Sequence, residues 1–224
     1  MGPRLLVVVE VVFLIMLLWW MAWYRESYTT PPPIPIYVIN LERRPDRLQQ
    51  CVAQFSPNRV RVVRAVDGKD IETETPSSMT LGEIGCFLSH QKALELIATS
   101  SAPHGIVLED DAIIDIPSDR FTRLLEVVPK DTDVVALGCN ALPASKMRHV
   151  VGEVYALHDY DFYGAHALLY TKRGAVKILE AMRRDGPKEP FDLWLGRLGV
   201  TMYVVSPPLA HPRNIQDSET QRTR

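Results

Sequence analysis

The chain has few residues of the kinds that build disulfide or zinc frameworks. Its 224 residues include three cysteines, Cys51, Cys86 and Cys139, which are widely spaced and odd in number. Such a set predicts neither a disulfide framework nor a zinc site, and buried free thiols are the expected state. The six histidines also lack metal-ligand spacing. Disulfide-stabilised and zinc-finger classes are therefore not indicated.

The chain also lacks an excess of charge of either sign. It carries 25 Lys and Arg against 27 Asp and Glu, a formal net charge of −2. A nucleic-acid-binding protein normally concentrates basic residues on one face, whereas here the two signs are evenly mixed. We therefore expect no nucleic-acid partner.

Three common site motifs are missing as well. No Gly-x-Gly-x-x-Gly follows the first predicted strand, and no Walker A sequence occurs anywhere in the chain. A Gly-x-Ser-x-Gly elbow is also absent. Standard dinucleotide sites, P-loop sites and the α/β-hydrolase nucleophile are accordingly disfavoured.

One long hydrophobic run is present at the amino terminus. Residues 5–24 are almost continuously apolar and close with Trp19, Trp20, Trp23 and Tyr24. Crossing a bilayer takes about 20 apolar residues, and such aromatic residues suit its interface. Because no small-residue cleavage site follows, the pattern predicts an uncleaved single-pass membrane anchor over residues 1–24. A type II orientation, with the amino terminus inside, is favoured.

The remainder divides into a short stem and one domain. Residues 29–35 read TTPPPIP, and proline-rich segments of this kind are stiff and extended, so residues 25–35 are assigned to a stem. Residues 36–224 contain no internal repeat or long low-complexity tract, which predicts a single domain.

Within that domain, strand and helix patterns alternate early and hairpin patterns come later. A Thr-x-x-Glu capping box at Thr80 and Glu83 opens one of the helices. The predicted strands are residues 36–41, 60–66, 106–109, 133–137, 150–157, 165–170 and 201–205, with 150–157 and 165–170 as an antiparallel pair; the other helices are 45–55, 118–128 and 171–184. This order predicts an α/β sandwich with a mixed sheet and a largely parallel, nucleotide-binding half.

The most informative stretch is IVLEDD at residues 106–111, an apolar run that ends in three adjacent carboxylates. Ligands of open α/β sheets bind at the carboxyl ends of strands. Glu109 and Asp111 could offer oxygen ligands to a hard divalent cation, with substrate phosphates completing the shell. A solvated junction between strand and loop explains the same acids about equally well.

Other polar residues stand near this strand end. The helix after Thr80 places Glu83, Cys86 and His90 on one face. His90 would touch a phosphate or a sugar hydroxyl there. The alternative is a helix-terminal acid with an ordinary half-exposed histidine.

The loop after the first strand is rich in arginine. It presents Asn40, Leu41, Arg43, Arg44 and Arg47 at a strand's carboxyl end. Guanidinium groups bind phosphate by paired hydrogen bonds, so this loop could bind a nucleotide. A solvated helix start has nearly the same composition.

A single acid, Asp192, lies in the apolar sequence PFDLW at residues 190–194. A partly desolvated carboxylate is a candidate proton acceptor. A helix N-cap would look identical in the sequence.

Taken together, five motifs resemble glycosyltransferase family 25, which includes lipooligosaccharide and collagen galactosyltransferases. The motifs are, in order, INLERRPDR, TLGEIGCFLSH, IVLEDDA, YGAHALLYTKRGA and PFDLW. The resemblance implies a GT-A-like fold of Rossmann type, a nucleotide-sugar donor and an inverting transfer.

The resemblance also implies roles for the residues named above. The loop residues Asn40, Leu41, Arg43, Arg44 and Arg47 would border the nucleotide. Glu83 and His90 would line the donor site, and the segment Glu109, Asp110 and Asp111 would replace the Asp-x-Asp metal motif.

The sequence hypothesis is a metal-dependent hexosyltransferase. It would move galactose or glucose from a UDP-sugar to a hydroxyl of a glycan, lipid-glycan or glycoprotein acceptor. Mn²⁺ or Mg²⁺ would be held by Glu109 and Asp111, and Asp192 and His90 would be the catalytic candidates. Two alternatives stay open: a catalytically silent, membrane-tethered module that binds nucleotide sugar or glycan, and a metal-dependent hydrolase of nucleotide sugars.

Overall fold

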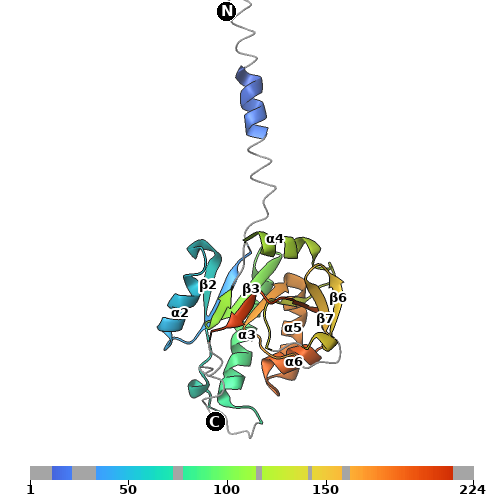
Figure 1. Ribbon diagram of the computed structural model, residues 1–224. Coiled ribbons are helices and arrows are strands. Elements are labelled where there is room, and N and C mark those ends of the chain that lie inside the picture. Colours follow the sequence, from blue (N-terminus) through green and yellow to red (C-terminus); the bar gives the residue numbers. More distant parts are fainter. Residues whose placement is uncertain are drawn as a thin grey trace, which may run out of the picture. The chain divides into compact units, whose positions relative to one another are not determined.

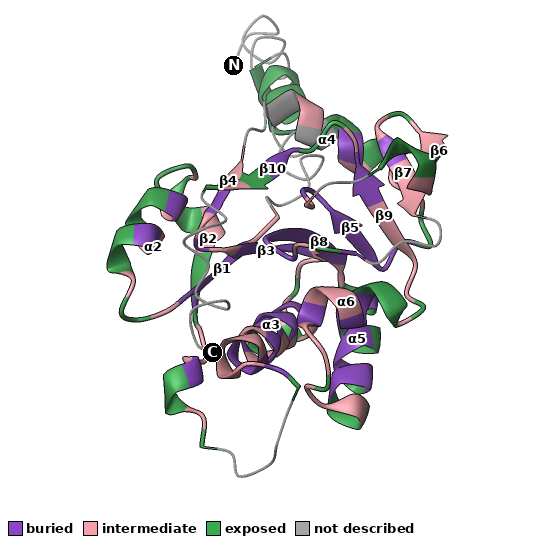
Figure 2. Ribbon diagram, turned by 60° about the horizontal axis from the view of Figure 1, so that its bottom comes forward, coloured by how far each residue is buried: buried purple, intermediate pink, exposed green. Residues whose placement is uncertain are grey.

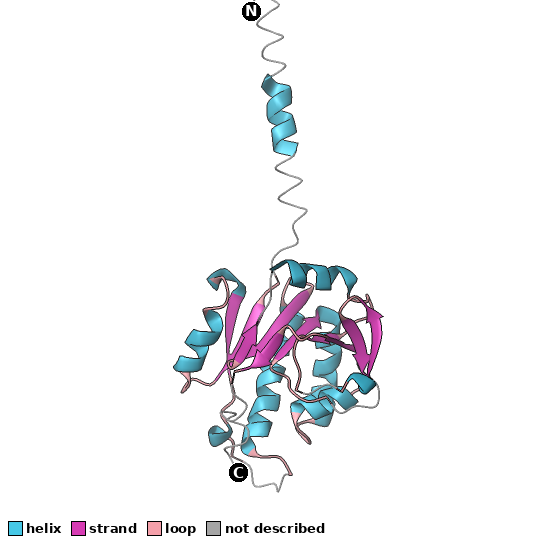
Figure 3. Cartoon of the chain, viewed as in Figure 1, coloured by secondary structure: helices cyan, strands magenta, loops and turns pink. Residues whose placement is uncertain are grey.

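A computed structural model describes residues 12–21, 34–72, 78–114, 118–140, 143–157 and 162–213. The chain forms two compact units, Met1–Pro33 and Ile34–Arg224. The second unit contains one large sheet flanked by helices, and Figure 3 distinguishes the two kinds of element.

In the first unit, residues 12–21 form a helix whose ten residues are all exposed. Residues 1–11 and 22–24 of the predicted anchor lie outside the described residues. Among the described residues, no helix is both long and apolar enough to cross a membrane. This finding contradicts the predicted localisation as a single-pass membrane protein of type II orientation, and it gives no support to a membrane partner. The predicted stem falls almost wholly outside the described residues.

The large sheet has eight strands in the order β2-β1-β3-β8-β5-β9-β7-β6. Its strands are β1 (Ile36–Asn40), β2 (Val60–Arg64), β3 (His104–Glu109), β5 (Val134–Ala136), β6 (Met147–Val151), β7 (Val154–Leu157), β8 (Ala167–Thr171) and β9 (Met202–Val205). Strands β2, β1 and β3 are parallel, and β8 runs antiparallel between β3 and β5. The predicted α/β sandwich with a mixed sheet is confirmed.

The predicted antiparallel pairing of residues 150–157 with residues 165–170 is wrong. β7 pairs with β6 in a hairpin and with β9, whereas β8 pairs with β3 and β5. The hairpin turns at Gly152, whose φ of 53° is in the left-handed region that glycine adopts without strain. A local turn therefore gives β7 its partner, and the apolar strand β8 is left for the centre of the sheet.

Helices cover both faces of the sheet (Figures 1 and 2). The helices are α2 (Pro45–Val52), α3 (Leu81–Thr99), α4 (Ser118–Val127), α5 (Lys172–Asp185) and α6 (Phe191–Arg197), with short 3-10 turns η1 (Pro57–Arg59), η2 (Gly68–Asp70) and η3 (Ala144–Lys146). α3, α5 and α6 pack on one face around Tyr37, Val107 and Tyr170. α2 and α4 cover the other face, where Val38 and Leu108 are buried.

Local signals position α3, the helix that matters most for the site. The predicted capping box is confirmed: Glu83 N donates to Thr80 Oγ1 at 3.1 Å, and Thr80 N donates to Glu83 Oε2 at 2.7 Å. Gly85 lets the helix approach the loop after β2, because a Cβ there would lie 2.5 Å from the Val66 carbonyl oxygen. The capping box thus sets where α3 starts, and Gly85 sets how closely it packs.

A small second sheet crosses the end of the large one. β4 (Ala112–Ile114) and β10 (Ala210–Pro212) pair antiparallel, directly after the acidic segment. Arg213 N donates to the carbonyl oxygen of Asp111 at 2.8 Å. This pairing holds the backbone that carries the acids against the end of β3.

Candidate functional site

The site lies where β1 and β3 end at one edge of the sheet. The two strands are parallel neighbours, and Ile39 is in register with Glu109, the last residue of β3. Asn40 ends β1, and Asp110 and Asp111 follow β3. Since successive residues of a strand point to opposite faces, Glu109 is directed toward α3 and Asp110 toward α2.

On the α2 side, the acids form a buried ion-pair network. Arg47 Nη1 lies 2.9 Å from Asp110 Oδ1, and its Nη2 lies 2.9 Å from Asp111 Oδ2. Asn40 Nδ2 donates to Asp110 Oδ2 at 2.7 Å and to the carbonyl oxygen of Arg44. One guanidinium is therefore shared by two carboxylates.

Both carboxylates of this network have raised pKa values. Burial raises the pKa of Asp111 to about 7, with a further increase from the negative charge of Glu109, although Arg47 opposes both. Burial also raises the pKa of Asp110 above its ordinary value. Asp111 Oδ1 is buried and has no hydrogen-bond partner in the described part of the chain.

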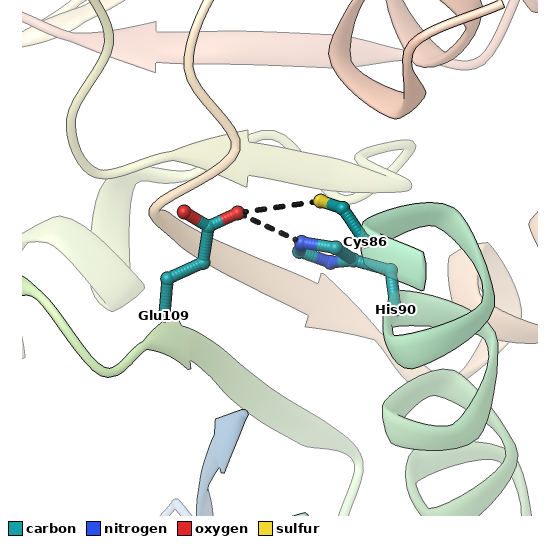
Figure 4. Close-up of side chains that lie close together, drawn as sticks. All are labelled: Cys86, His90 and Glu109. Atoms are coloured by element: carbon teal, nitrogen blue, oxygen red, sulfur yellow. Dashed lines mark hydrogen bonds and ion pairs between the residues drawn. The ribbon is translucent and has the colours of Figure 1, made fainter. Parts of the chain in front are cut away.

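On the α3 side, the acid is held by a histidine and a cysteine. His90 Nε2 lies 3.3 Å from Glu109 Oε1, and Cys86 Sγ donates to the same oxygen at 3.7 Å (Figure 4). The His90 ring is fully buried and stacks on Phe191 with 4.1 Å between ring centroids. Glu109 is thus contacted on one side by α3, whose position is fixed by core packing.

These contacts set the protonation of the cluster. Burial raises the pKa of Glu109, but the hydrogen bond from His90 and its charge outweigh burial and hold that pKa below the ordinary value. Burial and the Glu109 carboxylate raise the pKa of the Cys86 thiol well above its usual range. At neutral pH Glu109 is therefore ionised and Cys86 is a thiol.

Two hollows in the surface meet at this strand end. The first runs between the end of β1, the loop after β2 and the start of α3. The second lies between α6, the segment before β8 and the small sheet. Cys86, Glu109 and Asp111 line both hollows. A ligand that spans the two would therefore cross the acids.

The predicted nucleotide-binding loop lies along the first hollow. Leu41, Arg43 and Arg47 line it. Arg43 Nε lies 2.6 Å from Asp67 Oδ2, so a residue of the β2 loop orients this guanidinium. Arg44 pairs with Asp46 at 3.0 Å and is not among the residues lining either hollow. The structure thus brings most of the predicted loop to the site, with Arg44 turned to a neighbour.

Glu83 and Asp192 both line the second hollow. The Glu83 carboxylate is engaged by the capping box. Asp192 Oδ2 accepts from Gly164 N at 2.8 Å and Oδ1 accepts from Leu193 N at 2.9 Å, so the carboxylate is held in one orientation. Asp192 is thus directed by main-chain donors, and the sequence alternative of an N-cap for α6 does not apply because Pro190 occupies that position.

Two residues of the site were not predicted from the sequence: Cys86 as a ligand, and His166 in any role. Cys86 and His90 are one helical turn apart, a spacing that places both side chains on one face, and this signal was available. His166 is 3% exposed and lines the second hollow; burial lowers its pKa. Nothing in the apolar strand pattern around His166 distinguishes it from a core position.

The donor set at the end of β3 fits a hard divalent cation. Carboxylate oxygens are the ligands that Mg²⁺ and Mn²⁺ prefer, and Asp111 Oδ1 is a buried acceptor without a partner among the described residues. A cation there would also offset the charge that raises the pKa of Asp111. Glu109 and Asp111 are the residues that could hold it.

Comparison with known proteins identifies the same family as the five sequence motifs. The sequence profile described as Glycosyltransferase family 25 (LPS biosynthesis protein) matches residues 33–184. The chain is 27% identical over 201 residues to a Bos taurus protein named probable inactive glycosyltransferase 25 family member 3, covering 75% of this chain and 34% of the relative. It is 25% identical over 170 residues to procollagen galactosyltransferase 1 of Danio rerio, covering 65% and 28%.

The chain spans about a third of the length of these curated relatives. Among solved structures, a glycosyltransferase involved in glycosylation of the major capsid of PBCV-1 aligns over 77% of this chain and 81% of its own, with 12% identity and a TM-score of 0.45.

Proposed function

The chain belongs to glycosyltransferase family 25, and on that premise we propose that it is an inverting, metal-dependent hexosyltransferase. Its α/β sandwich with a mixed sheet is of the GT-A-like class that the sequence resemblance implies. The donor is a UDP-sugar carrying galactose or glucose, and the acceptor is a hydroxyl of a glycan, lipid-glycan or glycoprotein.

One observation carries this proposal. Glu109 and Asp111 stand on the wall shared by both hollows, and Asp111 has an unpartnered buried oxygen there. A donor with its nucleotide in the first hollow and its sugar in the second would place its diphosphate against these acids. Two negatively charged groups repel each other, and a divalent ion held by Glu109 and Asp111 would relieve this repulsion and stabilise the departing diphosphate.

The nucleotide side is assigned to the loop after β1. Asn40, Leu41, Arg43 and Arg47 lie at or beside the first hollow and would border the nucleotide, with Asp110 held by Arg47. Arg44 would support this loop, because its carbonyl oxygen accepts from Asn40.

Proton transfer is assigned to Asp192. Its carboxylate lines the second hollow and is oriented by two main-chain N–H groups, which leave lone pairs on both oxygens. Asp192 would accept the proton of the acceptor hydroxyl as that hydroxyl attacks the sugar. Glu83, on the same hollow, would border the sugar.

His90 has a different role in this proposal. Its side chain is completely buried at the wall of the first hollow and lies 3.3 Å from Glu109, so in this proposal it orients that carboxylate. His90 is thus a positioning residue.

The test is release of UDP from UDP-galactose and UDP-glucose by the purified chain, with and without Mn²⁺ and an acceptor mixture. Asp111→Asn should lower metal-dependent turnover by about 10²-fold or more, and Asp192→Asn by about 10²–10⁴-fold. Glu180→Gln, at an exposed carboxylate of α5 that lines neither hollow, is the control and should leave turnover unchanged. Unchanged turnover in Asp111→Asn would contradict the proposal.

A second function has one observation in its favour. A relative of this chain is named a probable inactive family member, which supports a silent module that binds nucleotide sugar or glycan without transfer. Calorimetric titration with UDP-sugar separates the two, because binding without UDP release indicates the module. UDP release that is independent of an acceptor, with free sugar as the product, would instead identify a nucleotide-sugar hydrolase.

A further inference from the structure

Three side chains of different chemistry converge beside the acids. The thiol of Cys86, the imidazole of His90 and the carboxylate of Glu109 each direct one ligand atom to the same point, and these atoms lie within 4.8 Å of one another (Figure 4). Cys86 and His90 come from consecutive turns of α3, and Glu109 comes from the end of β3. Helix and strand are both packed in the core, so the three groups are held together by the fold.

The two separations that involve Glu109 fit a tetrahedral metal centre. Zinc binds nitrogen and oxygen at about 2.0–2.2 Å and sulfur at about 2.3 Å. Two ligands of such a tetrahedron are therefore about 3.3 Å apart for nitrogen and oxygen and about 3.5 Å apart for sulfur and oxygen. Here the corresponding separations are 3.3 Å between His90 Nε2 and Glu109 Oε1 and 3.7 Å between Cys86 Sγ and the same oxygen. For these two pairs of atoms an ion would need shifts of at most a few tenths of an ångström, and the sulfur and the nitrogen lie within 4.8 Å of each other.

We propose that Cys86, His90 and Glu109 form a binding site for a borderline-soft divalent cation of the zinc class. Thiolate and imidazole ligands select such ions over Mg²⁺ and Mn²⁺, which prefer oxygen. The site is distinct from the all-oxygen one at Asp111, although Glu109 belongs to both. Because Cys86 and Glu109 line both hollows, the fourth coordination position opens toward them.

Binding changes the protons of the cluster in a defined way. The Cys86 thiol releases its proton to solvent and the thiolate bonds to the ion, while Glu109 remains ionised. Nε2 of His90 must lose any proton that it carries in order to coordinate, which leaves the remaining ring proton on Nδ1. Nδ1 is buried and has no partner among the described residues, so this second step opposes binding. The site therefore holds an exchangeable ion rather than a permanent structural one.

Cobalt titration of the full chain tests the site without any nucleotide sugar, so its result is independent of the proposed transfer reaction. A Co²⁺–thiolate bond gives a near-ultraviolet charge-transfer band that a site made of oxygen ligands lacks. We expect this band to saturate at one equivalent and to disappear in Cys86→Ser. It should persist in Cys139→Ser, which removes another thiol that is free and partly buried. Glu109→Gln should weaken Co²⁺ binding at least tenfold, whereas Asp111→Asn should not.

A measurement on the unmodified chain covers the case in which Cys86→Ser does not fold. X-ray absorption of the chain loaded with one equivalent of Zn²⁺ should show one sulfur ligand at about 2.3 Å. Absence of a sulfur ligand, or a cobalt band unchanged in a folded Cys86→Ser variant, would overturn the proposal.

Discussion

Two carboxylates at opposite ends of the central strands differ in how far neighbouring groups compensate their negative charge. Asp133, just before β5, accepts from Lys177 Nζ at 2.9 Å and from Thr201 N at 3.0 Å, and lies 3.3 Å from Arg173. Burial opposes its ionisation, but the Thr201 and Lys177 hydrogen bonds outweigh burial, so the pKa of Asp133 is lowered. At the other end, burial and Glu109 raise the pKa of Asp111 to about 7 despite Arg47.

The difference separates a structural charge from a functional one. The partners of Asp133 belong to the folded chain and are present at all times. Asp111 shares its guanidinium with Asp110, and one of its oxygens is unpartnered within the described residues. Uncompensated buried charge is typical of sites that await a ligand. The end of β3 thus carries negative charge that the described residues do not fully neutralise and that a bound ligand could neutralise.

Of the substitutions considered, removal of the shared Arg47 guanidinium should reduce stability the most. Arg47→Met leaves Asp110 and Asp111 buried without their cation, and breaking such a network costs about 3–5 kcal/mol in the free energy of unfolding. Urea denaturation measures this. Arg64→Met is the control: Arg64 and its partner Glu42 are 75% and 72% exposed, so the expected loss is about 0–1 kcal/mol. Equal losses in both variants would contradict the network's role.

Neutralising the structural carboxylate should have the next largest effect. Asp133→Asn weakens hydrogen bonds to a charged acceptor and leaves the Thr201 N–H poorly matched, which should cost about 2–3 kcal/mol at neutral pH. Lys177 and Arg173 are at least half exposed and can turn to water, which keeps the loss below that of Arg47→Met. A loss below about 0.5 kcal/mol would show that Asp133 is not a structural charge.

The stability difference between wild type and Asp133→Asn should depend on pH. Since the pKa of Asp133 is lower in the folded state than in the unfolded state, ionised Asp133 stabilises the fold above the unfolded value and this stabilisation is lost as the pH falls through the folded value. The stability gap between wild type and Asp133→Asn should therefore be full at pH 6 and shrink below about pH 4. Urea denaturation of both proteins along a pH series measures the gap, and a gap that grows on acidification would reverse the sign of the argument.

The functional carboxylate should show the smallest effect on stability. Asp111→Asn removes one hydrogen-bond acceptor of Arg47 but also removes charge that the network leaves uncompensated, so the free energy of unfolding should change by less than about 1 kcal/mol, in either direction. The increase in melting temperature with Mn²⁺ and UDP-sugar should disappear in this variant. A strongly destabilised Asp111→Asn that retains the ligand-induced increase would contradict the distinction between the two carboxylates.

Much of the fold could be predicted from local patterns. The capping box of α3 and the glycine that ends α5, Gly186 with φ of 65°, are determined by neighbouring residues, so short stretches of sequence predict them. The pairing of β8 depends on contacts between residues far apart in the chain, and there the sequence interpretation failed. The complete burial of Phe87 likewise depends on distant residues, because α3 is covered both by the sheet and by Phe191 and Trp194 of α6.

The candidate site was predictable as a set of residues but not as an arrangement. The acids at the end of an apolar strand and the arginines after β1 are visible in the sequence, because strand ends are recognisable by their composition. Their charge states are not visible, since the pKa of Asp111 depends on burial and on Glu109, Arg47 and Asp110 acting together.

The sequence by itself determined the α/β class, the family, the start of α3 and the presence of carboxylates after β3, because each follows from neighbouring residues or from ordered motifs. Only the tertiary structure decided which acid each layer receives. It directs Asp110 to Arg47 and Glu109 to His90 and Cys86. The physical reason is that a strand alternates its side chains between two faces. The side chains that they contact on each face belong to helices that are distant in the sequence.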